Sequence, residues 1–464
     1  MNTQLNMKLI WTMSLVAACG GLLFGYDWVV IGGAKPFYEA YFGINDPFLS
    51  GWAMSSALLG CVVGAIISGY MSDGLGRKRT LIISAVLFTV SAWGTAWFDT
   101  FDPFVFFRIV GGVGIGIASG ISPVYIAEIS PADRRGQMVA INQLTIVIGI
   151  LAAQLINLMI AEPITTQLTQ EELAATWNGQ RGWRWMFWAE LVPAVAFFVL
   201  MFFVPESPRY LAKIGKVDSA RKILNRIGGD EYAQTTITEI ETTLRGVENH
   251  KASLKETLKP KYRKALIIGI VLAAFQQWCG INIIFNYATD LFISAGMDLD
   301  STLKSIVATG SINLIITIIS LPLIDKIGRR RLILIGSAGL AIIYVAMCVA
   351  YAHGIMGMPV LMLVLGAIAI YALTLAPVTW VLLSEIFPNS IRGMAVSIAT
   401  LSLWVACFLL TYTYPIINSM IGAAGSFGLY CIISVAGFVF IFKNVPETKN
   451  VSLEEIEMKL VAQN

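Results

Sequence analysis

The chain has 464 residues, of which 56% are hydrophobic and only 13% are charged. In water-soluble domains about a quarter of the residues are charged, so this composition excludes an ordinary soluble protein and predicts one that lies in a lipid bilayer. The formal net charge of +3 is too small to indicate nucleic-acid binding.

Twelve apolar stretches are long enough to cross a bilayer, because its hydrocarbon core takes about 20 residues of helix. The first six lie near residues 9–31, 49–71, 81–98, 103–126, 138–160 and 186–204. The second six lie near residues 265–294, 303–324, 332–352, 359–384, 394–417 and 426–442. We therefore expect an all-α membrane protein with twelve transmembrane helices.

The stretch between the two sets of spans has a different composition. Residues 207–264 are rich in Lys, Arg and Glu, and their hydrophobic residues recur at helical spacing, which predicts short amphipathic helices. The expected domains are an N-terminal six-helix bundle at 1–206, these linker helices at 207–264, a C-terminal six-helix bundle at 265–443 and a tail at 444–464.

Basic residues are distributed unevenly among the loops. They cluster after the second, fourth, eighth and tenth spans and in the linker, whereas the opposite loops hold few, chiefly Lys35, Arg181, Arg184 and Lys304. Basic loops stay on the cytoplasmic side of a membrane. The distribution predicts that the linker and both termini are cytoplasmic.

Three loop motifs occur once in each set of spans and in the same order. An acid, a glycine and a basic run follow the second and eighth spans, in Asp73–Arg79 and Asp325–Arg331. A glutamate, a proline and an arginine keep one spacing after the fourth and tenth spans, and a Pro-Glu pair ends the sixth and twelfth spans. This repetition predicts two related halves, as in transporters that bind substrate where their halves meet.

Charged side chains in these motifs lie at the cytoplasmic ends of helices. Ion pairs there could clamp neighbouring spans together when that side is closed, and so act as the latch of a gate. The alternative is that they are only topology signals on a solvated rim. The expected gate residues are Asp73, Arg77, Glu128, Arg135, Glu206 and Arg209 in the first half and Asp325, Arg329, Glu385, Arg392 and Glu447 in the second.

Groups that could carry other chemistry are sparse. The six cysteines lie in apolar stretches without a CxxC pair, and the two histidines, His250 and His353, lie outside the spans. This pattern predicts neither disulfides nor a metal site. The sequence has no phosphate-binding loop of the GxxxxGK[ST] type and no nucleophile–base pair, so we expect neither an enzyme nor a bound cofactor.

Motifs spread over the whole chain resemble those of the sugar porter family of the major facilitator superfamily. They are Gly20–Asp27, Arg108–Gly116, Asn142–Gln143, Pro205–Arg209, Gln276–Asn282 and Pro377–Trp380. That family includes bacterial D-xylose–proton symporters and glucose facilitators. The resemblance implies the major facilitator fold, in which two pseudo-symmetric six-helix bundles carry a sugar between them.

Two ionisable residues within the spans stand out, Asp27 in the first and Arg108 in the fourth. A charge at bilayer depth costs about 2.5–3.5 kcal/mol on insertion scales, and such residues usually face the protein interior with a partner. An adjacent arginine keeps a carboxylate ionised, whereas burial favours its neutral form. We therefore expect Asp27 to carry a proton and Arg108 to pair with its ionised form. The alternative is a static structural ion pair.

Uncharged polar side chains gather in the fifth, seventh and eighth spans. Amides both donate and accept hydrogen bonds, as the hydroxyls of a neutral sugar require, and Gly280 could break the seventh span so that its amides point inward. The alternative is that these amides join helices and that the tryptophans fill the core. The substrate-binding residues that the amides, the rings and the resemblance imply are Phe24, Gln143, Gln276, Gln277, Asn282, Asn286, Asn313, Trp380 and Trp404.

Some positions depart from the pattern of the resembled family. Ile150 stands where xylose symporters have a second glutamine, and Asn286 replaces the first of two tyrosines. Ala376 replaces a glycine, and Leu403 replaces a Gln or Asn. The pocket is therefore expected to be altered, and xylose, glucose, galactose, arabinose and a cyclic polyol all stay open as substrates.

The resulting expectation is secondary active import of a pentose or hexose by proton symport, with alternating access, across a bacterial inner membrane. A monomer suffices for this architecture. One alternative is a passive sugar or polyol facilitator. A second is a sugar sensor that does not transport, although such sensors usually carry long cytoplasmic tails and only residues 444–464 follow the last span here.

Overall fold

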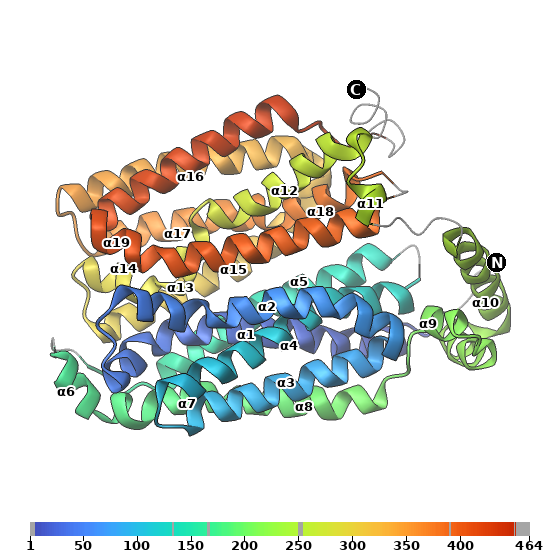
Figure 1. The fold of residues 1–464 in the computed structure, drawn as a ribbon, viewed down its shortest axis with the longest axis horizontal. Helices are drawn as coiled ribbons and strands as arrows, with labels where there is room; N and C mark the ends of the chain where they lie inside the picture. Colours follow the sequence, from blue (N-terminus) through green and yellow to red (C-terminus); the bar gives the residue numbers. More distant parts are fainter. Residues whose placement is uncertain are drawn as a thin grey trace.

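In a computed structural model of the protein, the first half forms a bundle of long helices (Figure 1). The structure describes residues 5–131, 134–164, 168–248, 254–388, 391–449 and 451. The first five spans are α1 (Met7–Phe42), α2 (Pro47–Leu75), α3 (Arg77–Trp97), α4 (Phe101–Ile129) and α5 (Arg135–Ile160). After the short α6 (Gln170–Ala175), the sixth span consists of η1 (Asn178–Gly182), α7 (Trp183–Trp188) and α8 (Leu191–Phe203).

The second half repeats this arrangement with more interruptions. Its elements are α12 (Arg263–Trp278), α13 (Ile281–Asn286), α14 (Ala288–Ser294), α15 (Leu299–Ile327), α16 (Arg329–Ala352), α17 (Met358–Leu373), α18 (Leu375–Glu385) and α19 (Arg392–Asn444). The described residues form eleven helical segments that are long and apolar enough to cross a membrane. One of them, α19, doubles back at Gly422, where φ is 69°. Counting α19 twice gives twelve crossings, in agreement with the sequence prediction.

The linker lies at one end of the two bundles, on the right in Figure 1. It contains α9 (Pro208–Lys213), α10 (Val217–Glu248), α11 (Leu254–Thr257) and η2 (Pro260–Tyr262). The backbone N–H of Asn6 donates to the carbonyl of Ile227 at 2.7 Å, so the start of α1 is attached to α10. We call this end of the molecule the linker end and the opposite end the far end.

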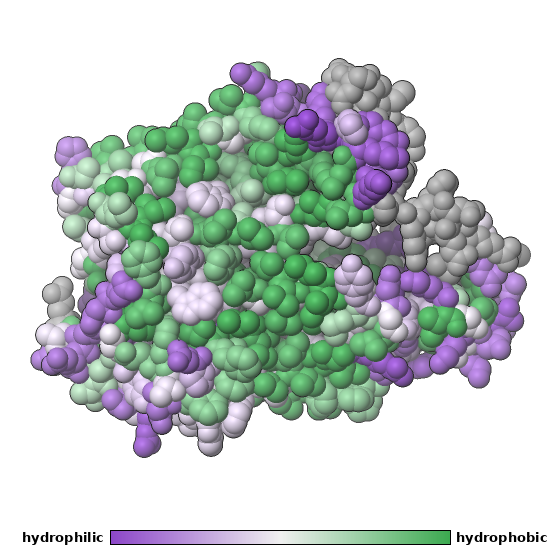
Figure 2. Space-filling view, in the orientation of Figure 1, coloured by the Kyte–Doolittle hydropathy of each residue, from purple (hydrophilic) through white to green (hydrophobic). Residues whose placement is uncertain are grey.

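The surface between the two ends suits a bilayer. Figure 2 shows hydrophobic residues over the middle of the molecule and hydrophilic residues at both ends. Large apolar side chains partway along the helices, such as Ile342 of α16 and Val199 of α8, are exposed there. In water this would be costly, whereas lipid tails solvate them.

Close backbone contacts hold α2 and α4 of the first half together. A Cβ added to Gly112 of α4 would lie only 1.8 Å from the carbonyl oxygen of Ala57 in α2, and one added to Gly60 of α2 would lie 2.1 Å from that of Ile109. Small residues allow such approach between membrane helices, where packing replaces the hydrophobic effect as the main attraction.

We expect Gly112→Ala to lower the free energy of unfolding by about 1–3 kcal/mol, because overpacking forces helices apart. Thermal unfolding of the detergent-solubilised protein measures this change. Gly69→Ala in α2 is the matched control, since nothing lies within 4 Å of an added Cβ there. An unchanged melting temperature for Gly112→Ala would show that α2 and α4 can separate at little cost.

Candidate functional site

The first candidate site is the buried ion pair between α1 and α4. Arg108 donates to the carboxylate of Asp27, and both residues are almost completely buried. The guanidinium also lies over the ring of Phe187, 5.6 Å from its centroid. Among the described residues, the second carboxylate oxygen of Asp27 has no hydrogen-bond partner. The structure therefore brings the two expected residues together, while their role in proton coupling stays a prediction.

A second acid, Glu190, lies beside this pair and was missed by the sequence analysis. Glu190 lies between α7 and α8, is 2% exposed, and interacts electrostatically with Asp27 and Arg108. Within the described part of the chain, its Oε1 has no hydrogen-bond partner. Two buried carboxyl groups thus lie close enough to one guanidinium to interact with it electrostatically. The available signal was an acid inside an apolar stretch, which deserves the same weight as Asp27.

The seventh span is broken where the sequence predicted it. Gly280 has φ of 88° and separates α12 from α13, which brings the amides on either side of it together. Asn282 donates to the side-chain oxygen of Gln277, and Gln277 donates to Gln276 at 3.2 Å. Further along, Asn286 donates to the hydroxyl of Thr411 in α19 at 3.4 Å. Gln276 also donates to the carbonyl of Ala376 in α18 at 3.3 Å, so the four amides form a polar strip that faces α18 and α19.

Three aromatic rings close the space between α1 and α19. The ring centroids of Phe24, Trp28 and Trp404 lie 5.7 to 5.9 Å apart. Trp28, which the sequence analysis did not single out, also lines a small cavity with Arg108 and Asn286. It therefore lies between the ion pair and the polar strip.

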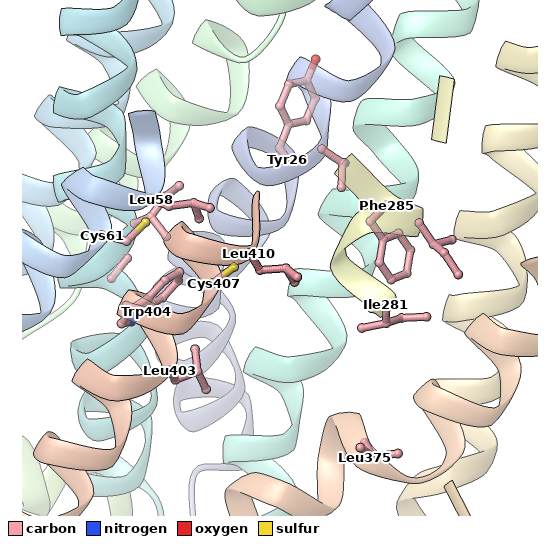
Figure 3. Packing of buried hydrophobic residues seen from close by; sticks show 14 of the residues in the cluster. Tyr26, Leu58, Cys61, Ile281, Phe285, Leu375, Leu403, Trp404, Cys407 and Leu410 are labelled. Atoms are coloured by element: carbon pink, nitrogen blue, oxygen red, sulfur yellow. The ribbon is translucent and has the colours of Figure 1, made fainter. Parts of the chain in front are cut away.

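Figure 3 shows how the two halves meet beside these groups. Trp404 and Cys407 of α19 face Leu58 and Cys61 of α2, and Phe285 of α13 lies on the other side of α19. The packed residues are apolar, so an apolar wall lies beside the polar strip.

Some polar atoms at this interface are left without partners in the described structure. They are the indole Nε1 of Trp404, the Oδ1 of Asn286 and the Oε1 of Gln154. A buried polar group without a hydrogen bond is costly, and the hydroxyls of a bound solute could supply one. The set contains both a donor and acceptors, which matches a polyol and not an ion.

The other expected binding residues are less tightly placed. Gln143 is half-buried in α5 and Asn313 is buried in α15. Trp380 in α18 is 41% exposed, and none of the ring contacts described joins it to the aromatic cluster. The structure therefore gathers Phe24, Trp404 and the four amides of the seventh span, and leaves the part of these three residues as a prediction.

The expected gate residues of the first half form one cluster at the linker end. Glu206 accepts hydrogen bonds from the backbone N–H groups of Arg77 and Lys78, both at 3.0 Å, and so caps the start of α3. The guanidinium of Arg77 pairs with Glu128 of α4 at 2.9 Å. Gly76 is needed before this turn, because φ is 92° and an added Cβ would lie 2.3 Å from Glu206.

The second half repeats the same cluster. Glu447 accepts from the backbone N–H of Arg329 at 2.9 Å at the start of α16, and Arg329 pairs with Glu385 of α18 at 3.2 Å. Gly328 has φ of 101° and takes the place of Gly76. The loop motifs that repeat in the sequence therefore place a glutamate at the start of a helix in each half. The helix dipole also favours a negative charge at this end of a helix.

The remaining gate residues lie around these two clusters. Asp73 pairs with Lys213 at 2.8 Å, Arg135 and Arg392 donate to backbone carbonyls, and Arg209 is exposed. The side chain of Asp325 lies outside the described part of the structure. Apart from the Asp73–Lys213 pair, which joins α2 to the linker helix α9, the gate contacts described here lie within one half, so a latch that crosses between the halves stays a prediction.

Besides the ring contacts between α1 and α19, an ion pair and a hydrogen bond join the halves toward the far end. Lys35 of α1 pairs with Asp290 of α14 at 2.9 Å, and Thr289 donates to the carbonyl of Gly32 at 2.8 Å. Near the linker end, Figure 2 shows a hollow between the two halves. The interface is thus closed at the far end and more open at the linker end.

The position of Lys35 corrects the sequence analysis, which placed it in a loop. It is 5% exposed and lies inside α1, which continues to Phe42 and not to residue 31. Two carboxylates neutralise the lysine, so the helix can carry this charge past the predicted end of the span. A hydropathy scan cannot foresee partners that come from a distant segment.

We expect Glu206→Ala to lower the free energy of unfolding by about 1–3 kcal/mol, because it leaves buried N–H groups at the start of α3 without an acceptor. Glu206→Gln keeps an acceptor and should lose less. Glu447→Ala should have a similar effect in the second half. Melting temperatures in detergent test this ranking, and equal losses for Ala and Gln at position 206 would contradict the capping role.

Comparison with known proteins agrees with this geometry. The family model described as "Sugar (and other) transporter" matches residues 13–460. The chain is 38% identical over 453 residues to the arabinose-proton symporter of Bacillus subtilis (strain 168), which covers 97% of this chain and 95% of that protein. It is 37% identical over 488 residues to the D-xylose-proton symporter of Escherichia coli (strain K12), which covers 98% of this chain and 97% of that protein.

A solved structure extends the match to three dimensions. The inward-open conformation of the xylose transporter XylE from E. coli superposes with a TM-score of 0.84 at 34% identity, over 97% of this chain and 100% of that chain. With twelve apolar crossings in two related halves, the chain is therefore a multi-pass membrane protein that belongs to the sugar porter family of the major facilitator superfamily, and it is a sugar transporter and not an enzyme.

Proposed function

We propose that this protein imports a monosaccharide, a pentose or a hexose, together with a proton across a bacterial inner membrane. The observation that carries the proposal is the contact between two sites. Arg108 of the buried pair and Asn286 of the polar strip both line the small cavity beside Trp28. A proton carrier and a hydroxyl-binding surface therefore share one wall.

The binding surface supports a neutral sugar as substrate. The amides of Gln276, Gln277, Asn282 and Asn286 lie along the same strip. Among the described residues, the indole N–H of Trp404 has no hydrogen-bond acceptor. Sugar hydroxyls can replace the bonds that these amides now make with each other, and the faces of Phe24 and Trp404 can pack on sugar C–H groups. The relatives named for arabinose and xylose support a pentose, while the altered residue Asn286 leaves the choice between pentose and hexose to experiment.

Proton coupling is assigned to Asp27. When Asp27 is ionised it holds Arg108; when it takes up a proton, the attraction falls and Arg108 is free to turn toward Glu190, the second acid of this cluster. Loss of one buried ion pair and formation of another changes how α1, α4 and the sixth span pack. This is the change through which protonation could alter access to the sugar.

Alternating access follows from the arrangement of the halves. The far end is closed by contacts between α1 and α14, and the two capping clusters make each half a stiff unit at the linker end. We assign the linker end to the cytoplasm, because basic residues concentrate there. The gate residues would then stiffen each half as it rocks, and a latch across the halves would form when this end closes. A monomer contains all of these parts.

We expect Asp27→Asn to abolish uphill sugar accumulation while exchange of labelled sugar across the membrane continues. An asparagine cannot bind and release the proton, but it preserves the size of the side chain. Uptake and counterflow in proteoliposomes with an imposed pH gradient measure the two processes. Accumulation that equals that of the unaltered protein would instead establish a passive facilitator or another proton carrier, and a wild-type protein that binds sugar without any uptake would indicate a sensor.

We expect Gln277→Ala to remove the rise in melting temperature that a sugar produces. A ligand at 100 times its Kd stabilises a protein by about 2.7 kcal/mol, so the wild-type shift is measurable. A panel of xylose, arabinose, glucose, galactose and inositol identifies the class of substrate. Gln234→Ala on the exposed face of α10 is the control, and a full shift in Gln277→Ala would place the sugar elsewhere.

A further inference from the structure

A buried lysine joins the two halves at the far end. The Nζ of Lys35 lies 2.9 Å from Glu39, four residues later on α1, and 2.9 Å from Asp290 on α14. It also lies over the ring of Tyr287, 5.7 Å from the centroid. The transport scheme above uses this lysine only as a sign that the far end is closed, and assigns it no task of its own.

The two carboxylates differ in their attachment. Glu39 belongs to the same helix as Lys35 and accepts a further hydrogen bond from the hydroxyl of Ser50 in α2, at 2.6 Å, so it is fixed to the first half. Asp290 belongs to the second half, and its side chain is 36% exposed. If the halves separate here, Lys35 keeps Glu39 and loses only Asp290. The lysine is therefore never left in the interior without a counter-charge.

The element that carries Asp290 is suited to move. α14 has only seven residues, and it is separated from α13 by Tyr287, whose φ of −114° and ψ of 25° are not helical. At its other end the chain turns at Gly296, where φ is 80°. The hydrogen bond from Thr289 to Gly32 also joins α14 to α1. A short segment bounded by two turns can swing away from α1 without disturbing α12.

We propose that Lys35 is a positioning residue for transport, which draws α14 onto α1 and so stabilises the state closed at the far end. Separation of Asp290 from Lys35 is the step that opens this end. The proposal extends the proposed function, because it takes alternating access as given. The test of this proposal needs no sugar and no proton gradient. The proposal can therefore be wrong while sugar transport is confirmed, and it can be right even if the substrate is a different one.

The test measures the distance between the halves at the far end. Cysteines introduced at exposed Glu171 of α6 and exposed Ser294 of α14, with the native cysteines replaced by alanine, carry spin labels in nanodiscs. Pulsed electron–electron double resonance then gives the distribution of distances between the two spin labels. We expect one dominant short distance in the parent protein. Asp290→Asn, which leaves the Lys35–Glu39 pair intact, should raise the population of a longer distance several-fold.

Matched variants separate this role from a general loss of charge. Asp300→Asn removes the partner of Lys304 at the same end, but that pair lies within α15, so the distribution should not change. Asp290→Glu should restore the short distance, and Lys35→Met should lengthen it as Asp290→Asn does. If Asp290→Asn leaves the distribution unchanged, or if Asp300→Asn shifts it equally, Lys35 does not hold the far end closed. Should Asp290→Asn fail to fold, Lys35→Met decides between the same two outcomes.

Discussion

The cost of a charge in a medium that cannot solvate it governs this structure. Inside the apolar bundles, ionised side chains are stable only beside an opposite charge, and the pairs Asp27–Arg108 and Lys35–Asp290 satisfy that condition. Each pair joins two helices, so its geometry depends on how those helices pack. A change in protonation therefore alters the free energy of helix packing, and a change in helix position alters the free energy of protonation. This coupling is what the proposed transport cycle needs.

The duplication supplies a scaffold and leaves the sites different. The capping clusters around Glu206 and Glu447 match closely, because both halves need stiff helix ends where they leave the membrane. The membrane interior does not repeat in this way. The first half contributes the buried pair Asp27–Arg108, whereas the second contributes the amides around the break at Gly280. Within the membrane, the first bundle thus supplies the buried charges of this pair and the second bundle supplies the hydrogen-bonding amides.

Much of the fold could be predicted from the sequence because the bilayer imposes a simple rule on helix length. The twelve crossings, the break at Gly280 and the pairing of Asp27 with Arg108 are all local patterns or consequences of burial. Lys35 and Glu190 escaped the analysis for a shared reason: whether an acid or base can stay in the membrane depends on partners that come from distant segments. Trp28 escaped because a tryptophan in an apolar stretch has no distinguishing signal until Phe24 and Trp404 are seen against it.

The first helix is where these contributions meet. α1 carries Phe24 and Trp28 against the ring of Trp404, Asp27 against Arg108, and Lys35 against Asp290. A shift of α1 at one of these contacts is expected to move the others, since they lie within about three turns of one another along the helix. In the proposed cycle, binding of sugar, loss of the proton and opening of the far end therefore act on one element. Because a ligand shifts a conformational equilibrium only through its different affinity for the two states, placing all three on α1 lets each event change the affinity for the others.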